Sequence, residues 1–180
     1  GGVGKSNFTL NFALELQKLG KKVLIFDADI GMANIDVLMG VRSQYNLLHL
    51  LNREKKMSEI IQSGPDSLPF IAGGSGLTEL FSLSEEDLIY FTQQIEEIAH
   101  EMDYIFFDTG AGLSKETIQF ITAADECIVV TTPEPTAITD AYALVKVVHD
   151  LEHAAVFRLV VNRASDRREA QHTADKFQLV

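Results

Sequence analysis

Apolar residues along the chain gather in short runs rich in β-branched and aromatic side chains. The runs are continuous rather than alternating, which is typical of parallel strands that are covered on both faces. They predict strands over Lys22–Asp27, Leu68–Ala72, Tyr104–Asp108, Glu126–Thr131 and Phe157–Asn162.

The longer segments between these strands carry a helical period. From Phe8 to Leu19, for example, apolar residues recur every three or four positions, which places them on one face of a helix. The same reasoning predicts helices over Lys5–Leu19, Ser84–Met102, Lys115–Ala123, Thr136–Leu151 and Arg167–Phe177.

Strands and helices that alternate in this way predict βαβ units. We therefore expect an α/β fold of three layers, with a mostly parallel twisted sheet and helices on both faces. The 180 residues suit a single domain over 1–180, whose least regular part is residues 40–80. Ligands bind such sheets at the carboxyl ends of the strands, so polar residues at those ends are candidates for function.

The segment GGVGKS, residues 1–6, stands directly before the first predicted helix. Glycines let backbone N–H groups approach an anion, and the helix N-terminus adds its positive dipole end. In such a loop Lys5 would reach the β- and γ-phosphates and Ser6 would ligate Mg²⁺. The alternative is a glycine-rich turn before a helix. We expect ATP to be bound by Gly1, Gly2, Val3, Gly4, Lys5, Ser6 and Asn7.

Carboxylates follow two of the predicted strands. Asp27 and Asp29 end the first, and Asp108 ends the third, before the glycine-containing stretch TGAG. Buried strand ends rarely gather carboxylates unless a cation or water needs them, although a single Asp often does no more than end a strand. Their joint occurrence after a phosphate loop favours a Mg²⁺ site made by Ser6, Asp27 and Asp108.

Two further loops are candidates for binding the nucleotide base. Asn162 and Arg163 follow the last predicted strand, and Pro133 lies in the rigid loop after the fourth. An Asn amide can both donate to and accept from the adenine edge. The alternatives are a turn-forming Asn and a Pro that starts a helix. We expect Asn162, Arg163 and Pro133 to complete the ATP site.

Charge and cysteine content exclude several classes of protein. The net charge is −11 and the basic clusters are pairs, so nucleic-acid binding is disfavoured. The one cysteine, Cys127, excludes an internal disulfide and a paired-cysteine cluster site. The apolar runs are far shorter than the ~20 residues that a membrane-spanning helix needs.

Taken together, the motifs resemble the MinD/ParA group of P-loop ATPases with a deviant Walker A sequence. The residues concerned are GGVGKS, DADIGMANID at 27–36, DTGAG at 108–112 and VVNR at 160–163. Within the group, FDTGAG at 107–112, IAGGSG at 71–76 and VTTPEPTAITDAY at 130–142 resemble the FlhG family, also written YlxH. That family comprises MinD-like regulators of flagellar number and placement.

The resemblance implies a MinD-like fold of the SIMIBI class and a slow, Mg²⁺-dependent ATPase that a dimer partner or another protein stimulates. Asp29 would orient the attacking water, Lys5 would act on the phosphates and Asp27 would support the Mg²⁺ shell. Two ATP-loaded subunits would form a homodimer. FlhF-type GTPase and flagellar C-ring proteins would be partners, and the protein would be cytoplasmic with reversible contact at the inner face of the cell membrane.

The family pattern also includes parts that this sequence does not contain. A central strand and a signature Lys would precede Gly1, and an amphipathic membrane-binding helix would lie after Val180. We therefore expect a domain truncated at both ends, with weak or no hydrolysis by this piece alone.

Other functions stay open at this point. A MinD-type ATPase that selects the division site and a ParA-type DNA-partitioning ATPase share the same motifs. A nucleotide-binding module that signals by occupancy without turnover is the third alternative. An iron–sulfur carrier on the same core is disfavoured because one cysteine cannot supply paired cluster ligands.

Overall fold

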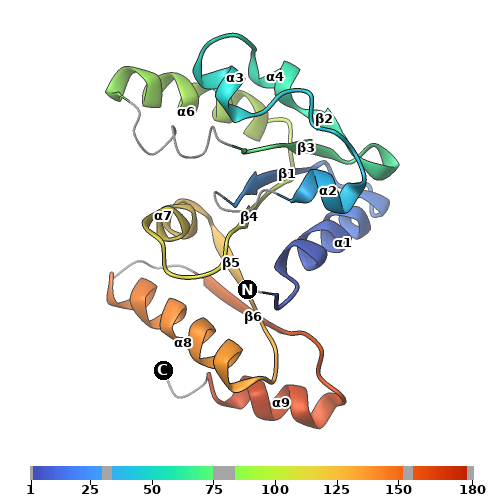
Figure 1. Ribbon diagram of the computed structural model, residues 1–180, viewed down its shortest axis with the longest axis vertical. Coiled ribbons are helices and arrows are strands. Elements are labelled where there is room, and N and C mark those ends of the chain that lie inside the picture. Colours follow the sequence, from blue (N-terminus) through green and yellow to red (C-terminus); the bar gives the residue numbers. More distant parts are fainter. Residues whose placement is uncertain (1, 30–33, 75–83, 152–155, 178–180) are drawn as a thin grey trace. The chain divides into compact units, whose positions relative to one another are not determined.

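The computed structural model describes residues 2–29, 34–74, 84–151 and 156–177. These residues form two compact units (Figure 1). The carboxylate unit is Ser6–Gly110, and the loop unit is Gly1–Lys5 together with Ala111–Val180. The expectation of one ATPase domain over the whole chain stays a prediction.

The carboxylate unit is built on a four-stranded sheet in the order β2-β3-β1-β4. β1 (Val23–Ala28) pairs in parallel with both β3 (Pro69–Ile71) and β4 (Tyr104–Thr109), while β2 (Gln62–Ser63) is antiparallel to β3. The predicted mostly parallel sheet is therefore confirmed. The short antiparallel β2 was not predicted from the sequence.

One face of this sheet packs against α1 (Lys5–Lys18) and α2 (Ile35–Met39). The core there includes Ala13 of α1 and the alternate residues Val23 and Ile25 of β1, all with no more than 2% of their surface exposed. Because side chains alternate between faces along a strand, Asp27 also points to this α1 face.

The opposite face is covered by α3 (Leu47–Leu51), α4 (Met57–Ile60) and α6 (Glu85–Ala99), as Figure 1 shows. Helices therefore lie on both faces, as predicted. α3, α4 and the 3-10 turn η1 (Pro65–Ser67) fall in the segment expected to be irregular. Helices of four or five residues make little more than one turn, so the sequence shows no helical period of apolar residues there.

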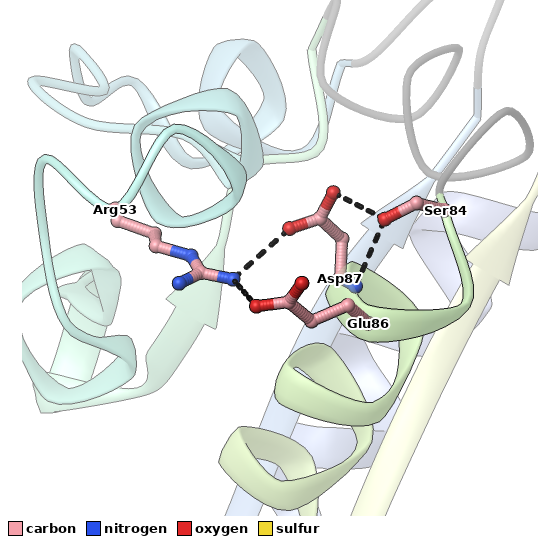
Figure 2. Close-up of polar contacts among 4 residues, drawn as sticks. All are labelled: Arg53, Ser84, Glu86 and Asp87. Carbon is pink, nitrogen blue, oxygen red and sulfur yellow. Dashed lines mark hydrogen bonds and ion pairs between the residues drawn. The ribbon is translucent and has the colours of Figure 1, made fainter.

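Helix α6 begins with a cap and an ion-pair cluster that Figure 2 shows. The Ser84 hydroxyl accepts a hydrogen bond from the Asp87 backbone N–H at 3.2 Å, which caps the helix start. Arg53, which follows α3, contacts Asp87 at 3.2 Å and Glu86 at 3.6 Å. Its guanidinium also lies 5.1 Å from the centre of the Tyr90 ring. The start of α6 is thus bound to the segment after α3.

The loop unit contains two parallel strands, β5 (Glu126–Thr131) and β6 (Val156–Val161), paired residue for residue. Its helices are α7 (Lys115–Ala123), α8 (Pro135–Asp150) and α9 (Arg167–Asp175). Ser114 and Asp166 cap α7 and α9 through hydrogen bonds from backbone N–H groups, which explains where these helices begin. Among the described residues, no helix has the length and apolar content to cross a bilayer.

Candidate functional site

The phosphate-loop segment adopts backbone angles that favour glycine. Gly2 and Gly4 have φ values of +88° and +96°, in the left-handed region that side chains with a Cβ avoid. A Cβ added to Gly4 would lie 2.6 Å from Nδ2 of Asn162, so a side chain does not fit there. Gly1, also predicted to bind ATP, lies outside the described residues. The described glycines therefore form a turn that only glycine accommodates without strain.

Asn162 holds this loop from the end of β6. Its Nδ2 donates a hydrogen bond to the Val3 carbonyl at 2.9 Å, and its Oδ1 accepts one from the Arg163 backbone N–H, also at 2.9 Å. The sequence predicted that the Asn162 amide recognises adenine; in the structure the amide binds backbone, and the adenine contact stays a prediction. A contact across 159 residues carries no local sequence signal.

A cavity of about 230 Å³ lies beside the loop. Arg163, one of the predicted ATP ligands, lines it, whereas Pro133 does not. The remaining lining residues come from the phosphate loop, the end of β5 and the start of α8: Gly2, Val3, Thr132, Glu134, Thr136, Ala137 and Asp140. Most of this lining is polar or charged, which suits a polar ligand.

Thr132, which lines the cavity, carries a buried hydroxyl. Its side chain is 2% exposed, and its Oγ1 is buried with no hydrogen-bond partner among the residues that the structure describes. Buried hydroxyls in folded proteins are nearly always hydrogen-bonded, so Thr132 Oγ1 is an exception among the described residues.

Asp27 and Asp108 lie side by side at the carboxyl ends of β1 and β4. The two residues are paired in register, and their side chains are 1% and 3% exposed. Neighbouring strands are about 4.8 Å apart, so the two carboxylates repel each other when both are ionised. The pairing of Asp27 with Asp108 places two carboxylates at neighbouring strand ends, in agreement with the sequence prediction.

The Asp27 carboxylate binds the segment that follows its own strand. Its Oδ2 accepts a hydrogen bond from the backbone N–H of Ile35 at 3.0 Å, and its Oδ1 accepts one from Asp29 at 3.3 Å. Burial raises the pKa of Asp27 to about 6 despite these two bonds, and the charge of Asp108 adds to the rise. Residues 30–33 between the two donors lie outside the described residues.

Asp108 is bound by the first helix. Thr9 Oγ1 donates a hydrogen bond to Asp108 Oδ1 at 3.2 Å. Ser6 stands one turn before Thr9 in α1, and residues three apart are neighbours on a helix surface. Ser6 therefore shares the side of α1 that carries Thr9. Sequence reasoning missed Thr9, because a threonine in a helix has no signal of its own.

Asp29 lies beside the loop that follows β4. A Cβ added to Gly110 would be 3.0 Å from Asp29 Oδ1, so the Asp29 side chain approaches this loop closely. The structure thus brings Asp27, Asp29 and Asp108 into one region of the carboxylate unit. It brings Gly2, Val3, Gly4, Asn162 and Arg163 together in the loop unit. Lys5 and Asn7, also predicted to bind ATP, lie in the first turn of α1.

The donors near Asp108 suit Mg²⁺ rather than a softer metal. They are carboxylate and hydroxyl oxygens, and the described residues contain no group of three or more His, Cys, Asp or Glu side chains arranged to hold a metal. Mg²⁺ in nucleotide sites takes one or two protein oxygens, with phosphates and waters as the other ligands. Ser6 and Asp108 therefore fit a Mg²⁺ that arrives with a nucleotide.

Cys127 does not contribute chemistry to either unit. It is partly buried in β5, and burial raises the pKa of its thiol to about 11. The thiol therefore stays protonated near neutral pH and is a poor nucleophile.

Comparison with known proteins finds one matching family model and several similar proteins. A family model described as an AAA domain matches residues 1–160. The flagellum site-determining protein YlxH of Helicobacter pylori is 41% identical, with 98% of this chain and 59% of that protein covered. The antiactivator FleN of Pseudomonas aeruginosa is 34% identical, with 96% and 61% covered.

Among solved structures, the septum site-determining protein MinD of Pyrococcus horikoshii, complexed with Mg-ADP, is similar with a TM-score of 0.72. Its sequence is 25% identical, and the match covers 96% of this chain and 73% of that one. The chain spans about three fifths of the length of the curated relatives named above.

Proposed function

The chain belongs to the AAA domain family, within the MinD/ParA type of P-loop proteins, and from this premise we propose that the protein containing it binds and hydrolyses Mg-ATP as a dimerisation switch. The observation that carries the proposal is the glycine turn at Gly2 and Gly4, held by Asn162 and continued directly by α1. Backbone N–H groups exposed in such a turn are suited to bind phosphate oxygens.

In this proposal, residues of α1 and of the strand ends bind the phosphates, the Mg²⁺ and the attacking water. Lys5 balances charge on the β- and γ-phosphates, and Ser6 and Asp108 hold Mg²⁺. Mg²⁺, when bound, neutralises the charge that develops on the phosphates. Asp29 orients the attacking water. Catalysis of this type depends mostly on positioning, so small displacements of these groups are costly.

Asp27 takes a structural part in this proposal. Its buried carboxylate accepts backbone hydrogen bonds from Asp29 and Ile35, so it fixes the residue that orients water. This is a narrower role than the Mg²⁺ ligand that the sequence predicted. It is compatible with a Mg²⁺ shell that reaches Asp27 through water.

We further propose that the switch controls flagellar number and placement. The support is the similarity to the flagellum site-determining protein YlxH, 41% identical over nearly the whole chain; the antiactivator FleN is 34% identical. An ATP-bound homodimer, an FlhF-type GTPase, flagellar C-ring proteins and reversible contact with the inner face of the membrane belong to the same proposal. In this setting the protein acts in the cytoplasm.

The biochemical proposal is tested with the full-length protein by calorimetry and phosphate release. We expect Mg-ATP to bind and to be hydrolysed slowly. Asp29→Ala should still bind ATP and dimerise but lose phosphate release. Binding and dimerisation with no turnover in the wild type would instead favour a module that signals by occupancy.

The cellular proposal has a MinD-type alternative, because MinD proteins are also among the relatives. Deletion of the gene separates the two roles. Altered flagellar number with normal division supports flagellar placement, whereas minicells with normal flagella support selection of the division site.

A further inference from the structure

Thr9 makes a contact that neither the sequence motifs nor the phosphate loop explains. It lies in the second turn of α1, and its hydroxyl donates to Asp108 Oδ1 at 3.2 Å, in a partly buried position. Asp108 is 3% exposed and stands next to Asp27 in the sheet register. The bond therefore joins the helix that carries Ser6 to the strand that carries Asp108.

The orientation of the Asp108 carboxylate is not set by its strand alone. Repulsion from Asp27, whose own oxygens accept the N–H groups of Asp29 and Ile35, disfavours a rotamer that points toward that neighbour. The hydrogen bond that the Thr9 hydroxyl donates from α1 draws the carboxylate toward the helix instead. Because Ser6 and Thr9 share one side of α1, the same bond holds the Asp108 carboxylate against the helix face that carries Ser6.

Mg²⁺ makes this orientation matter. It demands nearly ideal octahedral geometry with short oxygen distances, so two protein donors must be correctly spaced before it binds. Hydrogen bonds to a ligating carboxylate commonly fix that spacing. A hydroxyl that served only to satisfy a buried carboxylate would affect stability and leave metal binding unchanged.

We propose that Thr9 is a positioning residue for Mg²⁺, which acts through Asp108 by holding its carboxylate at the distance and orientation that Ser6 requires. The inference rests on the proposed Mg-ATP binding. It predicts that Thr9 controls how strongly Mg²⁺ and ATP reinforce each other's binding. It does not predict a change in ATP binding without metal.

The test is made on the full-length protein with a fluorescent ATP analogue. The Kd of the analogue is measured in Mg²⁺ and in EDTA, and the ratio of the two values reports the coupling. Thr9→Val keeps the shape of the side chain but removes the donor, and Thr9→Ser keeps the donor. Thr122→Val is the control, because Thr122 is also a helical threonine whose hydroxyl donates a hydrogen bond, here to the Gln119 carbonyl at 3.0 Å.

We expect Thr9→Val to reduce the coupling ratio by about 10- to 100-fold, the usual effect of losing a partner of a metal-binding group. Its Kd in EDTA should stay near the wild-type value. Thr9→Ser and Thr122→Val should keep the wild-type ratio. If Thr9→Val fails to fold, Thr9→Ala removes the donor without a second methyl group beside the carboxylate, and the same ratio is measured.

Two outcomes overturn the inference separately from the proposed function. A Thr9→Val or Thr9→Ala protein that melts at a lower temperature but keeps the wild-type coupling ratio shows a purely structural hydroxyl. A Thr9→Ser protein that loses the coupling between Mg²⁺ and ATP binding shows that the hydroxyl of residue 9 does not produce this coupling. A wild-type protein whose ATP binding ignores Mg²⁺ overturns the proposed function and this inference together.

Discussion

At the scale of single residues, Asp27 is a carboxylate that the fold buries almost completely and supplies with backbone N–H donors from both sides of residues 30–33. Its pKa is about 6 in the folded protein, against an ordinary value of 3.8, because burial disfavours the charged form. The folded protein therefore binds this proton more tightly than the unfolded chain does. The stabilising contribution of Asp27 is complete below about pH 4 and is lost as the pH rises to about 6.

Asp27→Asn tests this pH dependence. The variant cannot ionise at this position, so its free energy of unfolding should lack the loss that the wild type shows between about pH 4 and pH 6. The difference between the two proteins should change by up to about 1.4 kcal/mol for each pH unit in that range. Urea unfolding in EDTA over this pH range measures it. Parallel curves for the two proteins would contradict the assignment, whatever their constant offset.

Gly4 is the position where a side chain is expected to do most harm. Gly4→Ala places a methyl group into a left-handed residue and 2.6 Å from Asn162 Nδ2, so the bond from Asn162 to Val3 must break or shift. Gly20→Ala is the matched control, with φ +80° but no atom within 4 Å of the added Cβ.

Backbone strain alone should cost Gly20→Ala roughly 1–2 kcal/mol of stability and leave Mg-ATP binding intact. Gly4→Ala should cost more than the control and abolish Mg-ATP binding. Urea unfolding and calorimetry on the full-length protein measure both effects. Equal ATP affinity in the two variants would show that the loop does not need its observed shape.

Sequence reasoning located the candidate residues that end strands or form local motifs, because a buried strand followed by Asp, as at Asp27 and Asp108, is visible in a short window. It missed the contacts between distant segments. The donor that binds Asp108 is Thr9, 99 residues earlier, and the acceptor for Asn162 is the Val3 carbonyl, 159 residues earlier. Such partners are chosen by the sheet register and the helix packing, which no local pattern encodes.

At the scale of secondary-structure elements, the start of α6 combines a helix cap with exposed ion pairs (Figure 2). The Ser84 hydroxyl satisfies a backbone N–H that the helix leaves unpaired, whereas the Arg53 ion pairs are screened by water. Hydrogen bonding from Ser84 and the Arg53 guanidinium hold the pKa of Asp87 below its ordinary value. The cap should therefore matter more for stability than the ion pairs.

Two variants rank these contributions. Ser84→Ala should lower the free energy of unfolding by about 1 kcal/mol. Arg53→Ala should lower it by less, and the effect should shrink further in high salt because its ion pairs are exposed. Chemical unfolding at two salt concentrations measures both, and hydrogen exchange in the first turn of α6 locates the effect. A larger, salt-independent loss for Arg53→Ala would mean that packing on Tyr90 dominates.

Elements differ in how well the sequence predicted them. β5 was predicted over Glu126–Thr131 and has those bounds, since a continuous apolar run between polar residues is unambiguous. The helices α2, α3 and α4 were missed. α3, for instance, begins because the Asn46 side chain accepts the Leu48 N–H, and its buried residues Leu47 and Leu50 pack into the core. Local capping and tertiary packing, rather than a periodic pattern, determine such short helices.

At the scale of the whole molecule, the net charge of −11 argues against the ParA-type alternative, in which the protein would bind DNA. DNA phosphates are repelled by an acidic surface unless basic side chains neutralise them. We expect residues 1–180 to show no binding to duplex DNA by fluorescence anisotropy, even with ATP and at low salt. Binding that weakens steeply with added salt would instead support a DNA-partitioning role.

The loop unit joins two distant segments of the sequence, because the amide of Asn162 at the end of β6 holds the carbonyl of Val3. A ribosome adds Asn162 to the chain 159 residues after Val3. The growing chain therefore emerges with its glycine turn lacking the strand that shapes it, and local folding cannot supply a substitute. The turn should consequently become able to bind a triphosphate only after Asn162 has been made and β6 has paired with β5.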